Sequence, residues 1–155
     1  MRSRGSAASA RPGDKPPYKP HLDFAFWEGG AGPRRDPALI LRIEPAEILV
    51  GCGVPRLTGA ALEAHRAALR DAQLLAELDR HVSALLADGA ELSEPNRRRP
   101  PAGFDPAGPA ARFAVRDGFH VVRRHQRPAV VGSPRFVDWC AARLAPFAPV
   151  HHWLT

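Results

Sequence analysis

The sequence predicts an α+β fold, in which an antiparallel sheet of three to four strands carries helices on one face. Two features support this: apolar residues first alternate with polar ones, as in strands, and later recur at helical spacing. The 155 residues are 45% hydrophobic and 25% charged, which is typical of a globular domain. We expect a disordered tail at residues 1–13, which are small, polar and unpatterned, and a single domain at residues 14–155.

Three strands are expected in the first third of the chain. Leu22, Phe24 and Phe26 alternate in the first of them, as on a half-buried strand. The second and third form a hairpin, because Pro45 lies in a short polar segment at the position that a type I turn favours. The predicted strands are residues 21–27, 38–44 and 47–54.

Two helices should follow the strands. Thr58 is a candidate N-cap for a helix that runs to about Arg70, and Asp71 is a candidate N-cap for the next one. The second helix is the clearer, because its apolar residues recur at helical spacing and Gly89 is placed to end it. Those apolar residues are Leu75, Leu78, Val82, Leu85 and Leu86.

The last third of the chain is broken by prolines. We expect, in order, a long loop at 90–109, a short helix near 109–116 and a fourth strand within 118–126. Ser133 and Pro134 should open a last helix, as an N-cap followed by proline in the first turn. Pro146 and Pro149 are expected to interrupt that helix. Its predicted apolar face consists of Phe136, Val137, Cys140 and Leu144.

The net charge of +6 is unevenly distributed along the chain. Residues 1–20 carry +4, which leaves only +2 for the remainder. Within that remainder, residues 95–127 carry +6 and the helical stretch 58–88 carries −2. The protein is therefore not uniformly cationic, and nucleic acid is not the expected partner. No apolar run is long enough to cross a membrane, so a membrane partner is not expected either.

Neither cofactor nor metal is expected. The sequence has no P-loop, dinucleotide fingerprint or nucleophile-elbow motif. His151 and His152 are adjacent and would point in different directions on a helix, with no third ligand evident. Cys52 and Cys140 lie in apolar patterns, which predicts buried free thiols in a cytoplasmic protein.

The chain resembles a family that is catalogued as domain of unknown function 2461 and has no established reaction or ligand. The resemblance begins at the run Asp14-Lys15-x-Pro17-Tyr18-Lys19-x-His21. It continues through Ile43-Glu44-Pro45-x-Glu47, Gly51-x-Gly53, the segment Arg99 to Pro106, and the C-terminal segment "SPRFVDWCAARLAPFAPVHHWL". These motifs occur in the order that the family has, over about residues 14 to 154.

One departure from the family concerns the N-terminus. The resemblance implies a helical part ahead of the Asp14-Lys15 pair, where this chain has only the tail at residues 1–13. We therefore expect a chain that corresponds to the C-terminal two-thirds of a family member. Apolar surface that the helical part would cover should be exposed, which predicts self-association.

The candidate ligand site lies at the entry of the first strand. Lys15, Tyr18, Lys19 and His21 would supply two ammonium groups, a phenol and a ring N–H to an anion. The alternative is that the lysines are solvated and the two rings only close the edge of the sheet. Composition favours that alternative, and the family signature brings the two interpretations near to equal weight.

Three further residues complete the candidate site. Gly51 and Gly53 would leave the third strand flat on one face, as the floor of a shallow cleft, or they could mark a bulge. Arg99, in the basic triplet that begins at Arg97, is a candidate for phosphate binding, although a solvated basic face is the favoured interpretation.

Three functions stay open on the sequence alone. The leading hypothesis is a binding module that accepts a small anionic ligand at the strand entry. The second is an enzyme of unknown reaction that uses Lys15, Lys19 or His21 and is completed by the missing N-terminal part. The third is a nucleic-acid-associated protein that uses the basic segment 95–127. Glu44 and Glu47 could form an acid/base pair, but turn residues are usually wet, and a role in the turn is the better interpretation.

Overall fold

The computed structural model describes residues 20–155, and its five strands form one antiparallel sheet in the order β1-β2-β3-β5-β4. The strands are β1 (Leu22–Trp27), β2 (Ala38–Ile43), β3 (Glu47–Gly53), β4 (Glu91–Leu92) and β5 (His120–Gln126). The helices are α1 (Gly59–Arg70), α2 (Ala72–Ala87), α3 (Ala111–Ala114), α4 (Arg135–Leu144) and α5 (Ala148–Leu154). The predicted α+β class is therefore confirmed.

The first three strands form the predicted meander. β1 pairs with β2 from Leu22 opposite Ile43 to Trp27 opposite Ala38. β2 then turns back into β3 through a tight hairpin, in which the Glu44 N–H donates to the Glu47 carbonyl over 2.9 Å. The alternation of apolar residues places the three strands with their apolar rows on one face.

The fifth strand was not predicted. β4 contains only two residues and lies at the start of the segment that the sequence predicts as a loop. It pairs with β5, and the Ser93 N–H donates to the His120 carbonyl over 2.9 Å just beyond it. A two-residue strand is too short to show a period in the sequence, so its backbone partners alone identify it.

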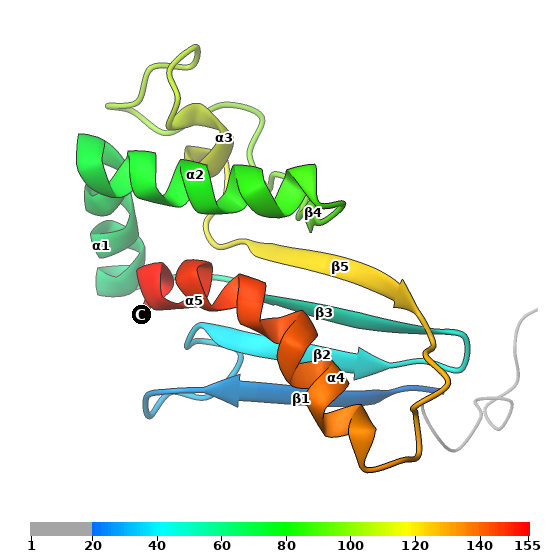
Figure 1. Cartoon of the computed structure of the whole chain (residues 1–155). Helices are drawn as coiled ribbons and strands as arrows, with labels where there is room; N and C mark the ends of the chain where they lie inside the picture. Colours follow the sequence, from blue (N-terminus) through cyan, green and yellow to red (C-terminus); the bar gives the residue numbers. More distant parts are fainter. Residues whose placement is uncertain (1–19) are drawn as a thin grey trace, which may run out of the picture.

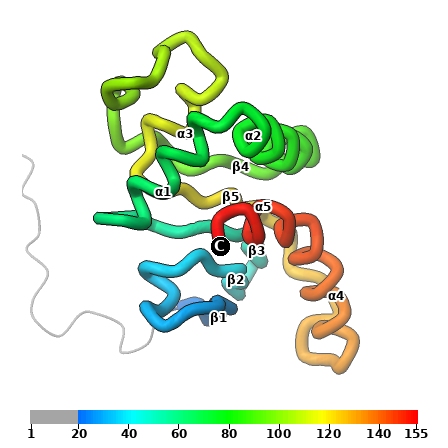
Figure 2. The backbone as a smooth tube through the Cα atoms, turned by 90° about the vertical axis from the view of Figure 1, so that its left-hand side faces the viewer, coloured from blue at the N-terminus to red at the C-terminus, as the bar shows by residue number. Residues whose placement is uncertain are grey.

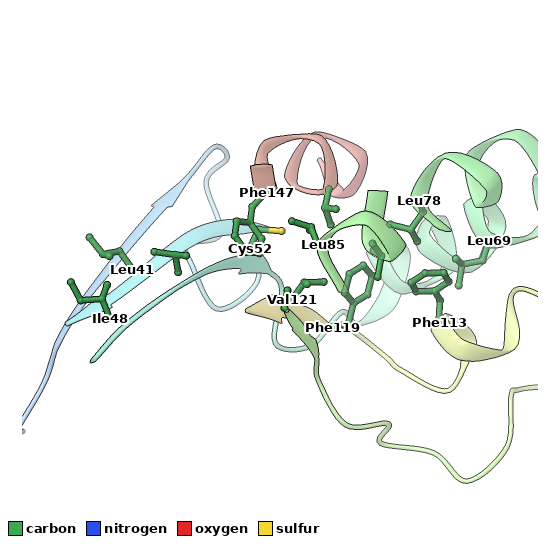
Figure 3. Packing of buried hydrophobic residues seen from close by; sticks show 14 of the residues in the cluster. Leu41, Ile48, Cys52, Leu69, Leu78, Leu85, Phe113, Phe119, Val121 and Phe147 are labelled. Atoms are coloured by element: carbon green, nitrogen blue, oxygen red, sulfur yellow. The ribbon is translucent and has the colours of Figure 1, made fainter. Parts of the chain in front are cut away.

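The helices α2, α5 and α4 lie on one side of the sheet (Figures 1 and 2). The core forms between these helices and the apolar row of the central strands. Figure 3 shows Leu41, Ile48 and Cys52 on the strands, and Leu78, Leu85 and Phe147 from the helical layer above them. Phe113 and Phe119 pack with their ring centroids 5.8 Å apart at the far end of this core.

Two helix starts differ in part from expectation. Asp71 caps α2 as predicted, because its carboxylate accepts the backbone N–H groups of Gln73 and Leu74. Thr58 occupies the N-cap position of α1, but its side chain makes no capping hydrogen bond. The N-cap of α4 is Pro134 rather than Ser133, whose hydroxyl instead donates to the carbonyl of Val130.

Of two predictions about the C-terminal region, one is wrong and the other is confirmed. Val137 does not belong to the buried face of α4, because it is 71% exposed, and Trp139 packs against the core instead. Pro146 and Pro149 do interrupt the α-helix as predicted, because α4 ends at Leu144 and a 3-10 turn at Ala145–Phe147 separates it from α5. Each proline lies in the first turn of its own short helical segment, where a missing N–H costs no hydrogen bond.

Candidate functional site

The candidate site is the sheet face that points away from α2, α4 and α5, which we call the open face. The strand register places Asp23, Arg42, Leu49 and Arg124 side by side across β1, β2, β3 and β5 on this face. The next row on the same face contains Ala25, Ile40, Gly51 and Val122. A charged row thus borders an apolar one.

A groove of about 730 Å³ lies over the open face. Ala25, Ile40, Leu49 and Val122 supply much of its apolar floor, and Arg42 and Arg124 lie at the end nearest the entry of β1. His120 lines the opposite end, and burial lowers the pKa of its imidazole. The groove can therefore accommodate a ligand with an apolar body and a charged end group.

Ion pairs organise the charged end of the open face. Asp23 accepts a hydrogen bond from Arg42 Nε over 2.6 Å and lies 3.3 Å from His21 Nε2. The hydrogen bond to Asp23 raises the pKa of the Arg42 guanidinium. Glu44 lies 4.0 Å from Arg42, and Glu47 pairs with Arg124. Three carboxylates thus face two guanidinium groups, so these side chains alone do not form a cationic cleft.

The predicted site residues fall into three groups. Lys15, Tyr18 and Lys19 lie outside the described residues. His21 lies immediately before β1 and contacts Asp23 at the charged end of the open face. Arg99 lies in the loop between β4 and α3, which Figures 1 and 2 place beside α3 and far from β1. The structure does not bring Arg99 to the strand entry.

Gly51 and Gly53 have a structural explanation. A Cβ atom at Gly51 would lie 2.3 Å from the Val121 carbonyl oxygen, and one at Gly53 would lie 2.3 Å from the Phe119 carbonyl oxygen. The close backbone approach expected for these glycines is therefore present, and its partner is β5. The alternative prediction of a bulge is wrong, because the β3–β5 register continues through both glycines. Gly53 also lines the groove.

Most arginines of the basic segment 95–127 are engaged in contacts within the fold. Six of its eight arginines have hydrogen-bond or ion-pair partners among residues 20–155: Arg97, Arg112, Arg116, Arg123, Arg124 and Arg127. In the same part of the chain, Arg98 and Arg99 make neither kind of contact. Most of these guanidinium groups hold neighbouring segments together instead of presenting a continuous patch to a polyanion.

The contact with the most partners among these, at Asp117, was not predicted from the sequence. The buried carboxylate of Asp117 accepts hydrogen bonds from Arg97 over 2.8 and 2.9 Å, from Arg66 over 3.2 Å and from Asn96 over 3.1 Å. The hydrogen bonds from Arg97 are the main cause that lowers the pKa of Asp117. Asp117 ties α1 and the long loop to the segment that enters β5, so its role is structural.

A second cavity, of about 610 Å³, lies between α1, the C-terminal residues and the β1–β2 loop. His65 lines it, and this imidazole packs between Phe119 and Trp153. Burial lowers the pKa of His65 to about 4, so the ring is neutral at physiological pH. Its Nε2 atom is buried without a hydrogen-bond partner, and being shielded from solvent it is not positioned to bind a ligand from the cavity.

Neither cysteine of residues 20–155 exposes its thiol. Cys52 and Cys140 are free and buried, as predicted, and burial raises the pKa of the Cys52 thiol to about 12. His151 is buried and His152 is exposed, so the two imidazoles do point apart. Residues 20–155 contain no group of three side chains placed to hold a metal ion. No helix in this part of the chain has the length and hydropathy to cross a membrane.

Comparisons with known proteins agree with the sequence motifs. Residues 12–153 match the model of a family described as conserved hypothetical protein (DUF2461). Searches of curated proteins and of solved structures found no match. Since the family match spans nearly the whole sequence, this chain belongs to the conserved hypothetical proteins of the DUF2461 family.

Proposed function

We propose that this protein is a cytoplasmic binding module that accepts a small anionic ligand with an apolar body in the groove of the open face. The observation that carries the proposal is the arrangement of Arg42 and Arg124 in one row beside an apolar floor. Their side chains are 41% and 51% exposed, so N–H donors of both guanidinium groups face solvent.

The anionic group of the ligand would lie at the entry of β1. Lys15 and Lys19 precede His21 in the sequence by six and two residues, and His21 lies at this end of the sheet. Two ammonium groups there would turn the slight excess of carboxylates at this end into an excess of positive charge. The apolar body would then extend along the groove toward Ile40 and Val122, which removes apolar surface from water.

An enzyme is the second candidate, and one contact favours it. His21 Nε2 lies 3.3 Å from Asp23 Oδ2 at the rim of the groove, which is the pairing of an imidazole base with an orienting carboxylate. Such a pair can accept a proton from a bound substrate. A nucleic-acid role has less support, because arginines of the basic segment are used within the fold.

The proposal is tested by calorimetric titration with inorganic phosphate and with octyl phosphate. We expect octyl phosphate to bind roughly a hundredfold more tightly, because about four buried methylenes contribute ~3 kcal/mol. Replacing Lys15 and Lys19 together with alanine should abolish binding of both probes, and Arg124→Gln should weaken it. Arg135→Gln is the matched control, because Arg135 is an exposed arginine at the start of α4, on the other face of the sheet.

Two results would contradict the proposal. One is equal affinity for inorganic phosphate and octyl phosphate, which would show that the apolar floor of the groove does not contribute to binding. The other is tight binding of duplex DNA with a salt slope of about −0.9 per neutralised phosphate. If that DNA binding were lost in the Arg98→Ala, Arg99→Ala double variant, the nucleic-acid role would be the correct one. Arg97 is left intact in this variant because it holds Asp117.

A further inference from the structure

The edge strand β1 presents a row of apolar side chains that the other residues of the described part, 20–155, leave exposed. Leu22, Phe24 and Phe26 are 62%, 44% and 52% exposed, and they point to the same face as the helical layer. They do not belong to the core cluster or to the partly buried side chains packed against it. The closest contacts of α4 and α5 with the sheet are made with β2 and β3, so the apolar row of β1 is covered less than the rows beside it.

Within residues 20–155, the outer side of β1 has little of the usual protection of an edge strand. Among residues 20–155 it pairs with one strand only, β2, so one side of its backbone lacks a strand partner. The strand contains no proline, lysine or bulge, which are the features that normally prevent pairing at an edge. Its one charged residue, Asp23, is already paired with Arg42 of the same chain.

We propose that β1 pairs with β1 of a second copy of this chain, in antiparallel orientation about a two-fold axis at Phe24. Another strand is the partner that best fits an open strand edge with alternating apolar side chains, because it pairs the backbone groups and covers the side chains together. The two sheets would join into one continuous sheet, with both helical layers on the same side.

The register follows from the side chains. With Phe24 on the axis, Phe24 faces Phe24 of the partner subunit, and Leu22 faces Phe26 of the partner subunit on both sides of it. All six apolar side chains of the two rows then meet across the interface. On the open face, Asp23 faces Ala25 of the partner subunit, so no like charges are opposed.

Two neighbouring registers also keep both helical layers on the same side of the joined sheet, but in each of them the opposed side chains match less well. A register centred on Asp23 would place the two Asp23 carboxylates opposite each other. A register centred on Ala25 would place Leu22 opposite Glu28 of the partner subunit and leave it without an apolar neighbour. The self-complementary arrangement about Phe24 is what selects a second copy over an unrelated strand.

The oligomeric state tests the interface. We expect light scattering after gel filtration to give twice the mass of one chain at tens of micromolar. Phe24→Asp should raise the dissociation constant by roughly tenfold or more, since it opposes two carboxylates at the axis. Val137→Asp is the matched control, because Val137 is also a strongly exposed apolar residue but lies on α4. A monomeric wild-type chain, or an assembly that Phe24→Asp leaves unchanged, would overturn the proposal.

Cysteine cross-linking tests the register. In the proposed pairing the two Phe24 Cα atoms lie about 4.5–5.5 Å apart, within the range of about 4.4–6.8 Å that a disulfide spans. The two Phe26 Cα atoms would be at least about 14 Å apart. Phe24→Cys should therefore form a covalent dimer on mild oxidation, and Phe26→Cys should not. The native cysteines are buried and serve as an internal control. Cross-linking of Phe26→Cys alone would overturn this register.

Discussion

The strands β3 and β1 have the same sequence pattern but opposite environments. Both alternate apolar residues, and both direct them to the helix-covered side of the sheet. In β3, Ile48, Val50 and Cys52 are completely buried, whereas in β1 the corresponding row is about half-exposed. Alternation therefore identifies the face to which a side chain points, but it does not determine how much of that face is covered.

The difference arises from the position of each strand in the sheet. β3 lies between β2 and β5, and α4 and α5 contact it from above. β1 has one strand neighbour, and no helix of residues 20–155 packs closely against it. Burial of a strand residue needs neighbours on both sides and a layer above, and among the strands with apolar alternation the central ones have all three.

The strongest test of this comparison is a pair of truncations. Ile48→Ala should lower the free energy of unfolding by about 2–5 kcal/mol, because it leaves a cavity in the closed core. Leu22→Ala should change it by less than about 0.5 kcal/mol, since the side chain is already in water. Urea denaturation at low micromolar concentration, where a second copy contributes little, measures both. Equal losses in the two variants would contradict the assigned burial.

A second test concerns how closely β3 and β5 approach each other at Gly51. Gly51→Ala should destabilise the fold by about 3 kcal/mol, because its Cβ would meet the β5 backbone, which cannot move independently of the sheet. Gly30→Ala is the control, since a Cβ at Gly30 would have nothing within 4 Å and should leave stability nearly unchanged. Thermal unfolding of the two variants gives the difference. A stable Gly51→Ala protein would imply a wider spacing between β3 and β5.

The smallest expected effect concerns a buried histidine. His65 is 6% exposed, and its folded pKa of about 4 is below the ordinary value of 6.5. The unfolded chain therefore takes up a proton first as the pH falls, and the fold loses stability between pH 6.5 and 4. The loss due to this group should be about 2 kcal/mol at pH 5, which His65→Phe should remove.

Unfolding experiments from pH 7 to pH 4.5 measure this dependence. The Asp117 carboxylate does not interfere, because its lowered pKa means that its stabilising effect is lost only below about pH 3.8. A His65→Phe protein with the same pH dependence as the wild type would show that His65 is not the titrating group.

The sequence predicted most of the helices and strands, but it predicted fewer of the segments with which they pair or pack. The strands at residues 21–27, 38–44 and 47–54 match β1 to β3 within a residue or two, because their alternation and the turn at Pro45 are local signals. The two-residue strand β4 and the helical continuation after Pro146 were missed. Both depend on backbone contacts that a sequence pattern does not record.

The candidate site could also be predicted only in part, because its residues come from strands that are distant in the sequence. The sequence identified His21 and the two glycines of β3, but the row formed by Asp23, Arg42, Leu49 and Arg124 exists only when four strands are placed side by side. Arg42 and Arg124 are 82 residues apart in the chain, and no local motif links them. Arg99, which a local motif did suggest, lies on a different part of the molecule.

By itself, the sequence determined the fold class, the family and the face of the sheet to which each strand residue points. These properties follow from local periodicity and local turn chemistry, which depend only on residues close together in the sequence. Only the tertiary structure decided that six of the eight arginines of the basic segment are held in internal contacts and that β1 is an edge strand with exposed apolar side chains. Burial and charge pairing are set by neighbours distant in sequence, and strand order determines which neighbours those are.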